Sequence, residues 1–152
     1  MQLLTLEEQF VQELKELLKL ERALIQQMAA VGDSIEELPI EFVRRYVSRK
    51  YDQVESLELI LKSMNQAVAE DITFENPMVS AVHAKLEACQ SNFLSTVDAL
   101  LDCAELLSAH YQHLARHAAI LGLADAEEIL DSAYAGEANT NISLTNFEFH
   151  HP

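Results

Sequence analysis

Three charged residues interrupt apolar helical stripes near the middle of three segments of the sequence: Glu21, Arg49 and Glu137. Each charge is flanked on both sides by apolar residues that recur at spacings of three and four, as on a core-facing helix. A charge in such a position costs free energy unless an opposite charge, a metal ion or water lies beside it. These residues are therefore candidates for chemistry inside a helical bundle, where carboxylates from facing helices build metal centres.

Arg49 carries the wrong charge for a metal ligand. A guanidinium is always protonated and would instead donate hydrogen bonds to the two glutamates, unless it extends out of the bundle to solvent. Counting along antiparallel helices places two further polar side chains at the same height. We therefore predict a central polar layer without metal and without catalytic residues, formed by Glu21, Arg49, Gln53, His110 and Glu137.

A metal site is the alternative interpretation. His110, His113 and His117 follow one another at spacings of three and four, so they share one broad helix face. Together with Glu21 or Glu137 they could hold one divalent metal, because imidazole and carboxylate groups are common ligands of such ions. The metal ligands of this alternative are Glu21, Glu137 and His110.

Capping residues and glycines mark the helices that must position these side chains. Thr5 and Glu8 form a capping box before the first apolar stripe, and Gly32 supplies a stop after it. Pro39 suits the start of a second helix, and Asn76 suits the cap of a third. The expected helices cover residues 6–31, 39–69, 78–90, 96–121 and 125–147.

Four of these helices are long and amphipathic and have short connections, which is typical of an antiparallel four-helix bundle. The segment 78–90 is an extra short helix between the second and third long helices. One continuous helix through both segments would be far longer than its neighbours. With 152 residues the chain is expected to form one domain, residues 1–152, with a flexible tail over 148–152.

Charge and hydropathy exclude several classes of partner. The formal net charge of −15 at pH 7 argues against binding to nucleic acids and to anionic membrane surfaces. Charged residues break the apolar runs before they reach the roughly 18 residues of a transmembrane helix. The acidic segment after Met1 lacks the basic residues and cleavage site of a signal peptide. We expect a cytoplasmic protein.

Nucleophilic catalysis has little support in the sequence. The two cysteines, Cys89 and Cys103, lie on an apolar helical line and are expected to be buried thiols. Neither is obviously next to a base. The sequence contains no Gly-Xaa-Ser-Xaa-Gly motif and no glycine-rich phosphate loop. A non-enzymatic protein is the favoured interpretation.

Several segments resemble the YciE/YciF-type ferritin-like proteins, which are bacterial, stress-associated and poorly defined in function. The similarity lies in the order and spacing of segments 5–10, 20–24 and 53–57, followed by the Leu-Gly hairpin at 121–122 that leads into the last helix. The resemblance implies a ferritin-like bundle, often dimeric, with a carboxylate-lined di-metal site at its centre.

Carried over to this chain, the resemblance implies a degenerate metal site. Glu21 and Glu137 occupy carboxylate positions of the family. Arg49 and Gln53 stand where the family has Glu followed one turn later by His or Gln. The family's remaining acids correspond to uncharged residues, which are Ala104 and Leu107, or Ala109 and Gln112 in another alignment, together with Gly136 and Asn141.

Apolar residues outside the core stripes predict a homodimer. Val43, Val47, Val54 and Leu61 form a second apolar line, and the segment 78–93 adds further apolar side chains. Apolar surface that one bundle cannot bury usually marks an interface, and twofold pairing is the commonest way to cover it. The alternative is that segment 78–93 folds back onto its own bundle.

These observations favour a structural or partner-binding helical protein with a degenerate di-metal site and no cofactor, stress-associated as the resemblance implies. The alternative is a ferritin-like oxidoreductase or metal-handling protein that binds iron or another divalent metal.

Overall fold

A computed structural model describes residues 4–31, 38–67, 74–88 and 92–150 of the chain. Within these ranges all regular structure is helical, and it forms five helices. They are α1 (Leu6–Val31), α2 (Ile40–Ser63), α3 (Pro77–Glu87), α4 (Phe93–Ile120) and α5 (Ala124–His150). The prediction of an all-α fold is confirmed.

Side chains of the expected types cap the helix starts. Oγ1 of Thr5 accepts a hydrogen bond from the backbone N–H of Glu8 at 3.1 Å, as a capping box requires. Oδ1 of Asn76 accepts from the N–H of Met78 at 2.9 Å at the start of α3. Asn92 caps α4 in the same way through Ser95 at 3.0 Å, so α4 begins at Phe93 rather than at the expected residue 96.

The end of α2 differs from the prediction. The helix stops at Ser63 rather than near residue 69 because Asn65 adopts a left-handed conformation with a φ of 58°. The N–H of Asn65 donates to the carbonyl of Lys62 at 3.0 Å, and that of Gln66 donates to the carbonyl of Leu61 at 2.9 Å. This pair of bonds is a Schellman motif, which ends a helix where a left-handed residue follows it.

Gly122 ends α4 with the same kind of motif. Its φ is 74°, a conformation that favours glycine. Its N–H donates to the carbonyl of Ala119 at 3.1 Å, and the N–H of Leu123 donates to that of Ala118 at 2.9 Å. The turn leads directly into α5, which continues to His150, so residues 148–150 of the expected tail are helical. Residues 151–152 lie outside the described part.

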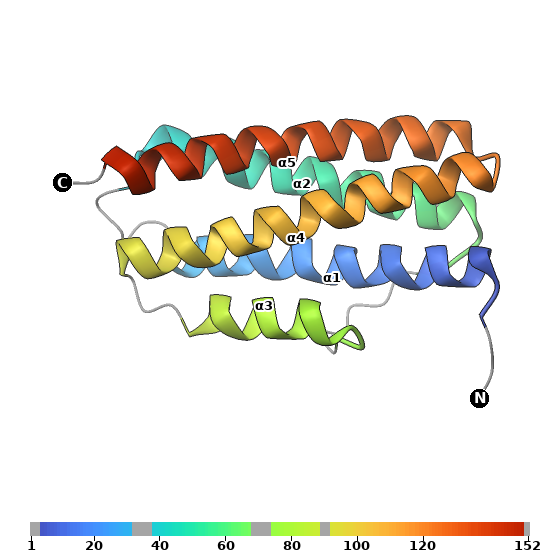
Figure 1. The fold of residues 1–152 in the computed structure, drawn as a ribbon, viewed down its shortest axis with the longest axis horizontal. Coiled ribbons are helices and arrows are strands. Elements are labelled where there is room, and N and C mark those ends of the chain that lie inside the picture. Colours follow the sequence, from blue (N-terminus) through green and yellow to red (C-terminus); the bar gives the residue numbers. More distant parts are fainter. Residues whose placement is uncertain (1–3, 32–37, 68–73, 89–91, 151–152) are drawn as a thin grey trace.

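The long helices α1, α2, α4 and α5 lie side by side along the molecule, and α3 lies against α1 and α4 (Figure 1). Contacting long helices run in opposite directions in the pairs α1/α2, α4/α5, α1/α4 and α2/α5. The helices α2 and α4 run in the same direction, so the chain between them returns along the length of the molecule and carries α3 on the way (Figure 1). This arrangement brings the middles of the four long helices together.

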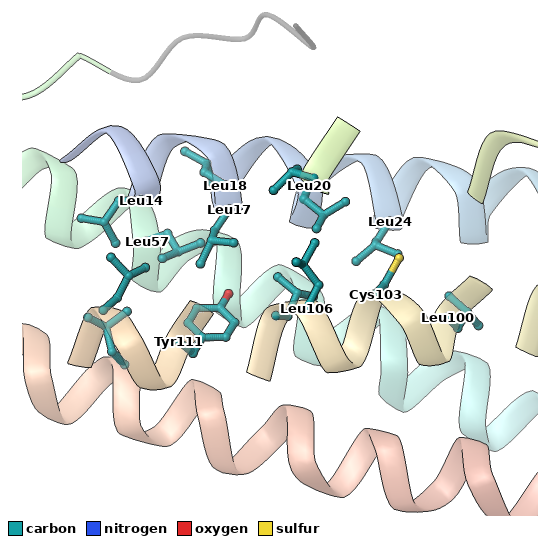
Figure 2. Close-up of a cluster of buried hydrophobic side chains, with 14 of the residues drawn as sticks. Leu14, Leu17, Leu18, Leu20, Leu24, Leu57, Leu100, Cys103, Leu106 and Tyr111 are labelled. Carbon is teal, nitrogen blue, oxygen red and sulfur yellow. The ribbon is translucent and has the colours of Figure 1, made fainter. Parts of the chain in front are cut away.

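Leucines dominate the core between the helices. Leu14 and Leu17 of α1 lie near Leu57 of α2 and Tyr111 of α4, and Leu24 of α1 lies beside Cys103 of α4 (Figure 2). All six side chains are at most 1% exposed. Cys103 lies in the same cluster and is buried as expected. Cys89 lies outside the described residues. None of the helices in the described ranges is long and apolar enough to cross a membrane.

The segment proposed for dimerisation packs on its own chain. Val79 and Leu86 of α3 are at most 1% exposed because α3 lies on α1 and α4. Leu61 of α2 is also fully buried. Two of the apolar side chains of α3 are therefore covered within the subunit, as expected if the segment folds back onto its own bundle, whereas Val82 is partly exposed and Met78 is 65% exposed.

Candidate functional site

A buried lysine lies at the centre of the helices. Nζ of Lys50 on α2 is 2.9 Å from Oε1 of Glu21 on α1 and also forms an ion pair with Oε1 of Glu137 on α5. All three side chains are at most 1% exposed. One ammonium thus bridges two carboxylates from two other helices in a part of the core that excludes water.

Arg49, which was expected to pair with the two glutamates, directly precedes Lys50 in the sequence and makes different contacts. Its Nη1 donates to the carbonyl oxygen of Gly136 at 2.9 Å and to Oγ1 of Thr140 at 2.6 Å. Arg49 packs closely along α5: a Cβ on Gly136 would lie 3.4 Å from Cδ of Arg49, an ordinary van der Waals contact. Arg49 is partly exposed and ties α2 to α5 rather than bridging the glutamates.

The two expected glutamates and Gln53 do come together. Nε2 of Gln53 donates to Oε1 of Glu137 at 3.1 Å. On the other side of the layer, the hydroxyl of Tyr111 donates to Oε2 of Glu21 at 3.0 Å. The ammonium of Lys50 also lies 5.3 Å from the centre of the Tyr46 ring, within the range of a cation–π contact. The buried polar layer is therefore Glu21, Lys50, Gln53, Tyr111 and Glu137.

Two oxygens of this layer make no hydrogen bond within the described part of the chain. They are Oε2 of Glu137 and Oε1 of Gln53, and both are buried. Buried polar atoms are nearly always hydrogen-bonded. The layer consequently retains some capacity to accept hydrogen bonds or to bind a cation.

Burial and charge determine the protonation of the layer. Burial raises the pKa of Glu21 to about 7, the charge of Lys50 opposes this rise, and the charge of Glu137 adds to it. Burial alone would lower the pKa of Lys50, but the two glutamates outweigh it and raise the pKa above its ordinary value. Lys50 is thus an ammonium at neutral pH, with three donors and no lone pair for a metal.

Two tyrosines and one cysteine beside the layer are neutral at physiological pH. Burial is the main reason why the pKa values of Tyr46 and Tyr111 lie well above the ordinary value. Burial also raises the pKa of the Cys103 thiol to about 12. Because the thiolate is the reactive form, this cysteine is a poor nucleophile.

His110 lies apart from the polar layer. It is about half buried, burial lowers its pKa, and the charges that act on it are those of Glu13 and His113. The alternative metal site of Glu21, Glu137 and His110 thus has its two carboxylates together and its histidine elsewhere. His113 and His117 lie one and two turns beyond His110 on α4, close to Glu13 of α1.

A groove lies beside the layer. This groove of about 350 Å³ between α2 and α5 reaches Tyr46, Arg49 and Thr140, but its lining does not include Lys50 or either buried glutamate. Charge pairing in the layer joins α1, α2 and α5.

Comparisons with known proteins support the fold. The crystal structure of the E. coli stress protein YciF is similar, with a TM-score of 0.77 over 95% of this chain and 94% of that chain. The two sequences are 19% identical over the match, so the likeness shows a shared fold. No protein-family model matches the chain, and a search of curated proteins gives no significant match. The resemblance to YciF-type proteins is confirmed for the fold.

Proposed function

We propose that this protein is a non-enzymatic, ferritin-like helical protein in which a buried lysine replaces a di-metal centre. Its role is structural or partner-binding, in the response to stress. The observation that carries the proposal is the ion pair of Lys50 with Glu21 and Glu137.

The direction of the helices supports a ferritin-like arrangement. Ferritin-like folds are four-helix bundles with one long crossover connection. Here the connection between α2 and α4 runs along the molecule and carries α3 (Figure 1).

The spacing of the polar residues supports a degenerate metal centre. Ferritin-like di-metal proteins take one Glu from each of two helices and a Glu-Xaa-Xaa-His pair from each of the other two. In this chain α2 has Lys50 and Gln53 at that spacing, and α5 has Glu137 and Thr140. Glu21 is the carboxylate that α1 contributes to the buried layer. The donor set therefore does not fit two cations, because a positive charge occupies a ligand position.

The charge balance gives the physical reason for this replacement. Two carboxylates brought together in a dry core repel one another, and a metal ion or an ammonium relieves the repulsion. Lys50 supplies the positive charge from within the chain. A metal ion at the same point would be repelled by the ammonium.

The stress-related role rests on the relative, and the association with a second copy rests on the surface of α2. YciF is described as a stress protein. The surface of α2 offers an apolar face for a homodimer: Ile40 and Tyr51 are 61% and 55% exposed, and Val47 and Val54 on the same face are partly exposed. Tyr51→Glu should convert a dimer into a 17.1 kDa monomer in light scattering. A monomeric wild-type protein at micromolar concentration would rule out the homodimer.

Metal analysis tests the proposed centre. In His113→Gln/His117→Gln protein, purified without a tag or chelator, we expect far less than one equivalent of iron, manganese or zinc per chain. His150→Ala and His151→Ala are included in every variant compared, because that adjacent pair could chelate metal by itself. With both histidine pairs removed, the remaining metal reports on the centre. The matched variant Lys50→Glu/Gln53→His restores the ligand pair of α2 and should bind more metal than its parent.

A metal-binding protein is the second candidate. It is favoured by the unpartnered oxygens of Glu137 and Gln53 in the polar layer. It requires Lys50 to lose its proton or to leave the layer. About two equivalents of metal in the double histidine variant would establish this candidate and overturn the first.

A further inference from the structure

We propose that Glu13, His113 and His117 form a site for one divalent transition-metal ion, with Zn²⁺ as the best match. Glu13 belongs to α1 and the two histidines belong to α4. One ligand atom from each residue lies within 4.8 Å of the other two. The site shares no residue with the Lys50 layer, so it can be tested independently of the proposed function.

Helix geometry explains why these side chains meet. Residues four positions apart lie on one helix face, and the imidazole rings of His113 and His117 have centres 4.0 Å apart. The antiparallel contact between α1 and α4 brings Glu13 to the same face. Its Oε1 lies 3.8 Å from Nε2 of His113.

Two of the three residues have a potential ligand atom that forms no hydrogen bond within the described part of the protein. Oε2 of Glu13 and Nδ1 of His117 are buried and have no hydrogen-bond partner there. Buried polar atoms usually have a partner, and an unpartnered one calls for an explanation such as a bound ion. A cation coordinated between the two helices would provide one.

The ligand set suits zinc. Two histidines and one glutamate, with water in a fourth position, are a common zinc environment. Imidazole groups favour zinc, copper and nickel over magnesium and calcium, which prefer sites made of oxygen atoms. The net charge of −15 also raises the local concentration of cations around the chain.

The three ligand atoms lie farther apart than in an occupied zinc site, but the side chains can move closer together. With bonds of about 2.0–2.1 Å, the ligand atoms of a tetrahedral zinc site lie roughly 3.4 Å apart. The side chains of His113 and Glu13 are 50% and 29% exposed. They can therefore rotate towards an ion without disturbing the core, and the ion can reach them from solvent.

A simple ion pair is the competing explanation. Protonated His113 would attract the Glu13 carboxylate at the observed 3.8 Å without any metal. In that case His117 would have no part in the interaction, and zinc would bind no better than to any other surface histidine. The two explanations therefore differ in what they predict for substitution of His117.

The test is a zinc titration of the full chain carrying His150→Ala and His151→Ala, because that adjacent pair could chelate zinc by itself. Competition with a zinc indicator at neutral pH should show saturable binding of one equivalent. Replacing a hydrogen-bond partner of a metal ligand costs roughly tenfold in affinity, so losing a ligand should cost at least as much. We expect this loss in Glu13→Gln, His113→Gln and His117→Gln.

His83→Gln is the matched control. His83 lies on α3 and pairs with Glu87 at 2.9 Å, so its substitution removes a histidine but no proposed ligand. Thermal unfolding of each variant checks that the fold is retained. Co²⁺ in place of zinc should give the intense visible bands of a tetrahedral or five-coordinate ion, and these should vanish in His117→Gln. Non-saturable binding, or equal affinity in His117→Gln and His83→Gln, would overturn the proposal.

Discussion

Nζ of Lys50 lies 2.9 Å from Oε1 of Glu21, and neither side chain is more than 1% exposed. Glu137 contacts the same ammonium from a third helix. The charges of Glu21, Lys50 and Glu137 thus depend on one another, because all three side chains are buried away from solvent. Breaking a buried pair is costly, whereas replacing the whole group with apolar residues is often neutral or stabilising.

Lys50→Met should strongly destabilise the protein. The substitution leaves two carboxylates facing each other in the core, and loss of one partner of a buried pair costs on the order of 3–5 kcal/mol. Urea unfolding monitored by circular dichroism measures the effect, with the exposed Lys62→Ala on the same helix as the control. The triple variant Lys50→Met/Glu21→Leu/Glu137→Leu should recover most of the lost stability. Equal midpoints for Lys50→Met and Lys62→Ala would show that the layer contributes nothing.

Arg49→Ala should cost less than Lys50→Met. It removes the hydrogen bonds to Gly136 and Thr140, and a bond from a charged group is worth about 1.5–3 kcal/mol. Water can reach the partly exposed site and replace part of this loss. The same urea experiment ranks the two variants. A larger loss for Arg49→Ala would mean that the arginine, and not the lysine, neutralises the glutamates.

The apolar pattern of α2 does not determine which residue, Arg49 or Lys50, pairs with the buried glutamates. Tyr46 and Gln53 face the core and are seven residues apart. Positions 49 and 50 both satisfy a spacing of three or four to each of them, so the apolar pattern allows either residue to point inwards. The contacts that Arg49 makes with α5, through the carbonyl oxygen of Gly136 and Oγ1 of Thr140, place it at the helix interface, while Lys50 faces the core. These contacts depend on the packing of two helices far apart in sequence.

Other parts of the fold follow from local signals. Thr5 and Asn76 cap their helices as their residue types predict, and Gly122 ends α4. The early end of α2 has a local signal too, since asparagine is the residue after glycine that best tolerates the left-handed conformation seen at Asn65. Tyr111 was not predicted in the layer. Its position, four residues after Leu107 on the apolar stripe of α4, indicates burial but not its bond to Glu21.

Cys103 should be unreactive in the folded protein. Its side chain is 1% exposed, and burial raises the pKa of the thiol to about 12. A Cys89→Ser variant leaves Cys103 as the single cysteine of the chain. A disulfide reagent added at neutral pH should modify it only after unfolding in urea, when the thiol becomes accessible. Rapid modification of the native protein would show that the core opens around Cys103.

Glu21 should make the protein less stable as pH rises towards neutrality. Burial raises its pKa from 4.5 to about 7 in the folded state. The folded protein therefore binds this proton more tightly than the unfolded chain does. The stability that the group contributes is fully present below about pH 4.5 and is lost as pH rises through about 7. Since one pKa unit corresponds to about 1.4 kcal/mol, the loss is at most about 3 kcal/mol.

Glu21→Gln isolates this contribution. The amide imitates the protonated carboxyl: its oxygen can accept from Lys50, and its NH2 group can donate to the hydroxyl oxygen of Tyr111. The substitution leaves one lysine paired with one glutamate. We expect the urea midpoint of the wild-type protein to fall more between about pH 5 and 8 than that of Glu21→Gln. Glu7→Gln, at an exposed position of the same helix, controls for the general effect of removing one negative charge from an acidic chain. Parallel profiles for wild type and Glu21→Gln would mean that Glu21 stays ionised in the core, with Lys50 neutralising it fully.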